Sequence, residues 1–98
     1  MPAYLISLDP EGEWYDDREA MEEYGRNVPQ MIGRYGGKYL LARRDAEVLE
    51  GEWNPGPIVL VEFPSREKLF AFYESEEYRP WLELRQRHGK TRIMIAES

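Results

Sequence analysis

Alternating apolar positions divide the chain into strands. Residues 3 to 8, AYLISL, are apolar and β-branched enough for a first strand, and Asp9-Pro10-Glu11-Gly12 supplies the turn residues that end it. Three further segments have the composition of strands: residues 38 to 43 (KYLLAR), 58 to 63 (IVLVEF) and 92 to 96 (RIMIA). The segment 58 to 63 is apolar on both alternating faces except at Glu62, which is typical of a central strand covered on both sides.

Between the first two predicted strands, apolar residues recur at intervals of three and four, which is the spacing of a helix. Asp16, followed three residues later by Glu19, resembles a capping box and predicts a helix that begins near residue 16. Spacings of three and four define one core-facing side of this helix, made of Met21, Tyr24, Val28, Met31, Ile32 and Tyr35. Pro29 predicts either a kink or a restart with Pro29 in a new first turn, and Gly36-Gly37 ends the helix.

A second helical region follows residue 64. Ser65 offers an N-cap for a short helix whose apolar side carries Leu69, Phe72 and Tyr73. Because Pro80 would disrupt one continuous helix, we expect a break between residues 75 and 79 and a final helical piece that ends at His88 before Gly89.

The resulting order, βαββαβ, predicts an α+β fold. It packs two helices on one face of a four-stranded antiparallel sheet whose first and third strands are central. The other face of that sheet has no cover within the chain. Since both central strands are apolar on both faces, a second copy of the chain is the expected cover, which predicts a homodimer through the open sheet face. The long segment from residue 44 to 56 is the one connection whose conformation the pattern leaves open.

Composition narrows the class of function. The 98 residues form a single domain, 1-98, and the net charge of -6 with unclustered bases argues against nucleic-acid and anionic membrane partners. The absence of cysteine and the single histidine exclude a cysteine-based zinc site and multi-histidine metal clusters, so we expect no metal. No phosphate-binding glycine loop is present, and we expect no cofactor. The N-terminus lacks the features of an export signal, so a cytoplasmic protein is expected.

Four blocks of sequence resemble the uncharacterised DUF1330 family: Y-G-G-K-Y-L (35 to 40), L-E-G-E-W-N-P (49 to 55), V-E-F-P-S (61 to 65) and S-E-E-Y-R (75 to 79). The resemblance covers nearly the whole chain. It implies a ferredoxin-like protomer that pairs sheet to sheet as a dimeric α/β barrel, with a cavity between helices and sheet, and it implies no known activity. Such proteins often carry Gly-Gly after the arginine of the second strand, where this chain has Arg44-Asp45.

Glu62 and Arg85 are the first candidates for chemistry. Glu62 shares a strand face with Ile58 and Leu60, where an isolated charge would cost several kcal/mol. Arg85 shares a helix face with Tyr78 and Leu82, so we expect the guanidinium to bind either the Glu62 carboxylate or an acidic ligand. The alternative is a purely structural pair that fixes helix to sheet.

The remaining candidates would complete a small-molecule pocket around that pair. Tyr39, Tyr78 and Trp53 are expected as aromatic walls, and Lys38 as a further ligand-binding residue or a solvated strand-start charge. His88 is a candidate general base because its unperturbed pKa lies near neutrality. Its place at a helix end also suits a simple cation at the negative helix terminus.

Three functions follow from these residues. The first is a cofactor-independent enzyme acting on a small aromatic or acidic molecule, with Glu62 as acid or base and Arg85 holding an anionic group. The second is a non-catalytic module that binds a small molecule. The third is a structural homodimeric domain in which the two residues only lock a helix in place.

Overall fold

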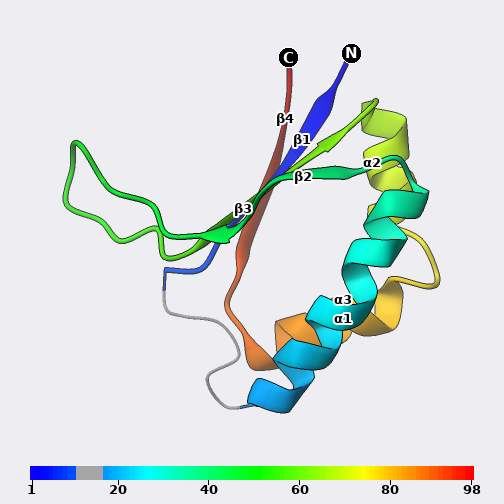
Figure 1. Ribbon diagram of the computed structural model, residues 1–98, viewed down its shortest axis with the longest axis horizontal. Helices are drawn as coiled ribbons and strands as arrows, with labels where there is room; N and C mark the ends of the chain where they lie inside the picture. Colours follow the sequence, from blue (N-terminus) through cyan, green and yellow to red (C-terminus); the bar gives the residue numbers. More distant parts are fainter. Residues whose placement is uncertain (11–16) are drawn as a thin grey trace.

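The computed structural model describes residues 1–10 and 17–98 and arranges them as four strands and three helices (Figure 1). In chain order these are β1 (Ala3–Leu8), α1 (Arg18–Arg34), β2 (Lys38–Arg44), β3 (Ile58–Phe63), α2 (Arg66–Tyr73), α3 (Arg79–His88) and β4 (Arg92–Glu97). The predicted elements are therefore present. β2 and β4 each extend one residue further than the apolar pattern indicated.

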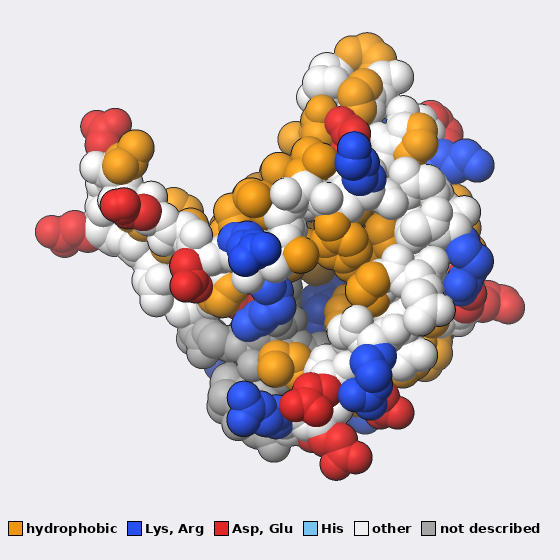
Figure 2. Space-filling view, viewed as in Figure 1, with side chains coloured by type: hydrophobic (Ala, Val, Ile, Leu, Met, Phe, Trp, Pro, Cys, Tyr) orange, Lys and Arg blue, Asp and Glu red, His pale blue; other side chains and the backbone are white. Residues whose placement is uncertain are grey.

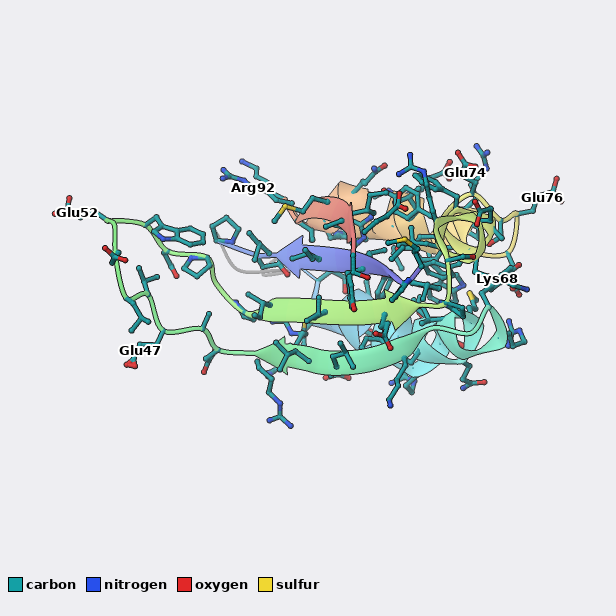
Figure 3. The ribbon with its side chains drawn as sticks, turned by 90° about the horizontal axis from the view of Figure 1, so that it is seen from above. Glu47, Glu52, Lys68, Glu74, Glu76 and Arg92 are labelled. Carbon is teal, nitrogen blue, oxygen red and sulfur yellow. The ribbon has the colours of Figure 1, made fainter. Side chains whose placement is uncertain are left out.

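The sheet has the order β2-β3-β1-β4, and every neighbouring pair is antiparallel. This is the ferredoxin-like α+β arrangement, and it confirms that the first and third strands are central. All three helices lie on one side of the sheet (Figure 1). In the view of Figure 3 the strands lie in front of α1, so that view looks onto the face without helices.

Strand register separates the two faces of the sheet. On the helix side, Leu5 pairs with Val61 and Ala3 with Phe63, and these four residues belong to the buried core. On the other face, a row of apolar side chains crosses all four strands at mid-length: Leu41, Leu60, Ile6 and Met94. A neighbouring row on this face contains Lys38, Glu62, Tyr4 and Ala96.

Helix α1 is fixed at both ends by local hydrogen bonds. The Asp17 carboxylate accepts from the Ala20 amide at 3.0 Å, so Asp17 is the N-cap, whereas the predicted Asp16 lies outside the described residues. At the other end, Gly36 has φ +84, its amide donates to the Gly33 carbonyl at 3.0 Å, and the Gly37 amide donates to the Ile32 carbonyl at 2.9 Å. These two bonds are the Schellman pattern, which needs a left-handed residue that glycine adopts without strain.

Pro29 neither ends α1 nor restarts it, because the helix is continuous from Arg18 to Arg34. The expected restart is therefore wrong. Val28 and Ile32, on either side of the proline, are buried in the core. Tertiary packing of this apolar face compensates for the hydrogen bond that Pro29 cannot donate.

The predicted break before Pro80 is present and positions a core residue. Ser75 donates to the Phe72 carbonyl at 2.8 Å and accepts from the Tyr78 amide at 3.2 Å, which ends α2 and leads into α3. Tyr78 is the N-cap residue of α3, and Pro80 falls in the first turn, where its missing N–H leaves no hydrogen bond broken. The side chain of Tyr78 is only 2% exposed, so the break directs it into the core.

The connection between β2 and β3, residues 45–57, projects beyond the sheet as an arm (Figure 1). Figure 3 shows Glu47 and Glu52 at its far end, pointing away from the helices. Its base is held against the end of β1, where the Asp9 amide donates to the Pro55 carbonyl at 3.1 Å. Gly56 is required there, because a Cβ at this position would lie 1.8 Å from the Asp9 carbonyl oxygen.

Candidate functional site

A cavity of about 430 Å³ lies between the helices and the helix side of the sheet. Figure 2 shows it as a hollow with hydrophobic walls and basic side chains inside. Its apolar lining includes Leu5, Met21, Ile32, Val61, Phe72 and Ile93. Its polar lining includes Ser7, Tyr24, Tyr39, Arg43, Tyr78 and Arg85. The size and this mixture are typical of small-molecule sites.

Arg85 is the most unusual residue of this cavity. It is only 5% exposed, and its Nε and Nη2 atoms are buried without a hydrogen-bond partner. Burial acts to lower the pKa of Arg85, but the neighbouring Tyr78 and Tyr24 outweigh it, and the pKa lies above its ordinary value. The cavity therefore contains a permanent positive charge with two nitrogen atoms, Nε and Nη2, that have no hydrogen-bond partner.

Two tyrosines join the helices beside this guanidinium. The hydroxyl oxygens of Tyr24, on α1, and Tyr78, before α3, are 2.6 Å apart. Burial, followed by the proximity of Tyr78, raises the pKa of Tyr24 well above its usual value. Burial also raises the pKa of Tyr39 to about 12. Tyr24 and Tyr39 thus remain protonated at physiological pH, and their hydroxyl groups can donate hydrogen bonds.

Asp9 supplies an acidic group near the same cavity. It is only 2% exposed, and its Oδ2 accepts from Arg43 Nη1 at 3.4 Å. Burial raises the pKa of Asp9, and the Thr91 hydroxyl, Arg43 and Arg85 oppose that effect only in part. With Asp9 ionised, Arg43 and Arg85 leave one positive charge in excess.

The structure brings together three of the seven candidate residues. Tyr39, Tyr78 and Arg85 all line the cavity. Tyr39, expected beside Glu62 and Arg85, is paired with Val61 in the register and so lies on the face of the sheet that Glu62 does not share. Helical spacing placed Tyr78 and Arg85 on one face, seven residues apart, and both are buried.

The expected Glu62–Arg85 pair does not form, because the two residues lie on opposite sides of the sheet. Glu62 belongs to the row of Lys38 and Tyr4 on the face without helices, and it accepts a hydrogen bond from the Tyr4 hydroxyl at 3.2 Å. Alternation had correctly assigned Glu62 to the face of Leu60. The error lay in assigning that face to the helices, which cover the face of Val61.

Lys38, His88 and Trp53 are also outside the cavity. Lys38 is exposed and lies opposite Glu62 in the register. The Nε2 atom of His88 is 3.7 Å from Asp17 Oδ2, so it links the end of α3 to the start of α1. Trp53 is 57% exposed on the arm. None of the three lines the cavity with Arg85.

Sequence reasoning missed three residues that contribute to this site. Tyr24 was assigned to the apolar side of its helix and Asp9 to a turn, and Arg43 was treated only as the end of a strand. Extending the alternation of β1 by one step would have placed Asp9 on the face of Leu5 and Ser7. No signal marked Arg43, whose backbone has the left-handed φ of +50 that favours glycine.

Neither metal-binding groups nor membrane-spanning helices are found in the part of the chain that the structure describes. Within residues 1–10 and 17–98 there is no group of three or more His, Cys, Asp or Glu side chains that could hold a metal ion. Within the same residues, every helix is too short or too polar to cross a bilayer.

A family model described as "Domain of unknown function (DUF1330)" matches residues 3–98. No curated protein matches the sequence. Among solved structures, a protein of unknown function from Rhodopseudomonas palustris is similar with a TM-score of 0.70 and 22% identity, over 99% of this chain and 82% of that chain.

Two further solved structures resemble the chain at lower identity. SnoaB, a cofactor-independent oxygenase from Streptomyces nogalater, has a TM-score of 0.65 and 8% identity over 99% of this chain and 91% of its own. A dimeric ferredoxin-like protein of unknown function from Jannaschia has a TM-score of 0.60 and 14% identity over 99% and 98%. At these identities the likeness shows the fold.

Proposed function

This chain belongs to the DUF1330 family, a domain of unknown function, and we propose that it binds a small organic monoanion in the cavity between the helices and the sheet. The observation that carries this proposal is the buried Arg85 guanidinium, whose Nε and Nη2 atoms have no hydrogen-bond partner. Leaving such a charge unpaired costs several kcal/mol. A carboxylate can accept two parallel hydrogen bonds from a guanidinium, which would offset that cost.

The charges of the site favour a ligand with a single negative charge. Arg43 and Arg85 contribute two positive charges, and the Asp9 carboxylate contributes one negative charge. A monoanion would make the occupied site neutral. A dianion would leave an excess negative charge close to Asp9, whose ionisation burial already disfavours.

The walls of the cavity favour an apolar or aromatic body on that ligand. Leu5, Met21, Ile32 and Val61 offer aliphatic contacts, and Phe72 adds an aromatic one. A volume of about 430 Å³ is sufficient for a molecule with one aromatic ring and a short acidic substituent.

Isothermal titration calorimetry with phenylacetate tests the proposal. The parent protein is expected to bind phenylacetate and to bind the neutral amide, phenylacetamide, much more weakly. Arg85→Met should weaken phenylacetate binding at least about tenfold, because a charge-assisted contact is lost. Arg87→Met is the matched control, since Arg87 lies on the same helix but is exposed. Equal binding of acid and amide, or unchanged binding by Arg85→Met, would contradict the proposal.

A cofactor-independent enzyme that uses the same cavity is the second candidate. The observation that favours it is the buried Asp9 carboxyl with a raised pKa near Arg85, a group suited to proton transfer. Glu62 cannot fill that role for a ligand on Arg85, since it lies on the other face of the sheet. If the parent converts a bound aromatic acid and Asp9→Asn does not, the enzyme hypothesis is supported. If the parent binds the acid without converting it, only the binding function remains.

We further propose that the sheet face without helices packs against a second copy of the chain. Its middle row, Leu41, Leu60, Ile6 and Met94, is apolar across all four strands, and Met94 is 51% exposed. An apolar row of this length is costly to leave in water. The Jannaschia protein of the same fold is described as dimeric, which supports this assembly.

A further inference from the structure

The cavity opens to solvent between α1 and the edge strand β2. We propose that the bound molecule is an elongated monocarboxylic acid, whose carboxylate lies deep in the cavity beside Arg85 and whose apolar body extends outward over Gly25. This inference rests on the proposed binding of a monoanion, and it specifies the orientation and the shape of that ligand.

Exposure of the lining residues locates the mouth of the cavity. Among the lining residues that the structure describes, the solvent-exposed ones are Gly25 and Pro29 on α1 and Ala42 and Arg43 on β2. Because β2 is an edge strand, the sheet ends at this side of the cavity. Figure 2 shows the hollow open toward the viewer. A ligand therefore enters between α1 and β2.

The charge that would hold the carboxylate lies away from this mouth. Arg85 is buried, and its Nε and Nη2 atoms have no hydrogen-bond partner. At the mouth, the Arg43 guanidinium is 3.4 Å from Asp9 Oδ2, so its charge is already opposed by a carboxylate. A ligand carboxylate is therefore bound more strongly at the buried end, and the rest of the molecule points toward solvent.

The buried end has little room for substituents next to the carboxylate. Tyr78 is a side-chain hydrogen-bond partner of Arg85, and the ring centroids of Tyr78 and Phe72 are 4.4 Å apart. Both aromatic residues are buried and line the cavity. A bulky group beside the carboxylate would collide with these rings, whereas the same group at the far end of the ligand would reach the mouth.

Gly25 keeps the helix side of the mouth open. Met21, Gly25 and Pro29 follow one another at intervals of four residues on α1, and all three line the cavity. A Cβ at Gly25 would meet nothing within 4 Å, and its φ is not positive, so neither packing nor backbone conformation requires glycine there. Glycine inside a helix is less favourable than alanine. The open space above Gly25 suits the apolar body of a ligand.

The first test compares two isomeric probes by calorimetry on the full chain. Phenylacetate with a second phenyl ring in the para position places that ring at the mouth, whereas the ortho isomer places it beside the carboxylate. The parent is expected to bind the para isomer at least as tightly as phenylacetate. It should bind the ortho isomer at least about tenfold more weakly than the para isomer, because the packed end cannot take the extra ring without strain.

A second test fills the mouth. Gly25→Leu is expected to weaken the para isomer at least about tenfold and phenylacetate less than about threefold, because only the longer molecule loses apolar contacts at residue 25. Gly33→Leu is the matched control: Gly33 is exposed on the same helix and its Cβ would also meet nothing within 4 Å, but it does not line the cavity. It should leave both affinities unchanged. Leucine is a better helix former than glycine, so thermal unfolding should show both variants at least as stable as the parent.

The outcomes separate this inference from the proposal on which it rests. If the parent binds phenylacetate but binds the ortho and para isomers equally, or rejects the para isomer, the orientation is wrong and the monoanion proposal stands. That comparison requires no variant to fold. Unchanged binding of the para isomer by Gly25→Leu would overturn the placement over Gly25. If the parent binds neither phenylacetate nor the two isomers, both proposals fail.

Discussion

The hydroxyl oxygens of Tyr24 and Tyr78 lie 2.6 Å apart and connect α1 to the residue that begins α3. Both residues line the cavity together with Arg85, and Tyr78 is 2% exposed. This contact fixes the spacing of the two helices above the sheet. It therefore helps to set the shape of the cavity in which the guanidinium lies.

Removing this hydrogen bond should destabilise the protein by a modest amount. Tyr24→Phe and Tyr78→Phe are each expected to lower the free energy of unfolding by about 1 kcal/mol, since each deletes one hydroxyl of a buried pair. Denaturant unfolding of the single and double variants forms a double-mutant cycle. A coupling energy near zero would show that the two hydroxyl groups contribute independently.

Arg85→Met is expected to retain or increase stability while it weakens anion binding. The methionine removes a buried charge whose Nε and Nη2 atoms are unpaired, and such replacements are often neutral or stabilising by about 1–4 kcal/mol. Thermal unfolding without ligand measures the effect, with the exposed Arg87→Met as the control. A loss of several kcal/mol in Arg85→Met alone would mean that the guanidinium serves the fold rather than a ligand.

Asp9→Asn should stabilise the protein at neutral pH and lose that advantage in acid. The folded pKa of Asp9 lies above the ordinary value of 3.8, so the folded state binds the proton more tightly than the unfolded chain. The stability gained from protonation is therefore present below pH 3.8 and lost as the pH rises through the folded pKa. Asparagine imitates the neutral carboxyl group, so the melting temperatures of variant and parent should converge in acid. A lower melting temperature for Asp9→Asn at neutral pH would contradict the raised pKa.

Gly37→Ala should destabilise the turn that follows α1. An added Cβ would lie 2.4 Å from Ile32 Cγ2 and 2.9 Å from Phe63 Cε1, both in the core. Overpacking of this kind costs about 1–3 kcal/mol. Gly33→Ala is the matched control, since its Cβ would meet nothing within 4 Å and alanine is the better helix former. Equal unfolding midpoints for the two variants would be inconsistent with this packing.

Leu60→Lys should separate the proposed dimer. Leu60 lies in the middle of the apolar row, between Leu41 and Ile6, so a second sheet would have to bury the new charge. Sedimentation should report twice the chain mass of 11.6 kDa for the parent and the single mass for the variant. Glu47→Lys, far out on the arm in Figure 3, introduces the same side chain away from the sheet and should leave the mass unchanged. A parent that sediments as a single chain would refute the dimer.

Local sequence signals were sufficient for the elements and their order. Gly36-Gly37 ended α1 as predicted, Ser65 capped α2, and Pro80 required a break before α3. Each of these signals acts through the backbone of its own neighbourhood, which is why it can be read without knowing the fold. Pro29 is the exception, because packing of Val28 and Ile32 in the core maintained a helix that local preference would have interrupted.

The sequence by itself determined which residues share a strand face, since alternation is a property of the extended backbone. It did not determine which face meets the helices, because both faces of β1 and β3 are apolar, and so it placed Glu62 beside Arg85. Only the tertiary structure decided that Val61, and not Glu62, faces the helices. It alone brought Arg43 of β2 and Arg85 of α3 to the same cavity, with Asp9, which follows β1, close to both. Residues so far apart in the chain come into contact only through the packing of helices on the sheet. Local sequence patterns therefore do not predict these contacts.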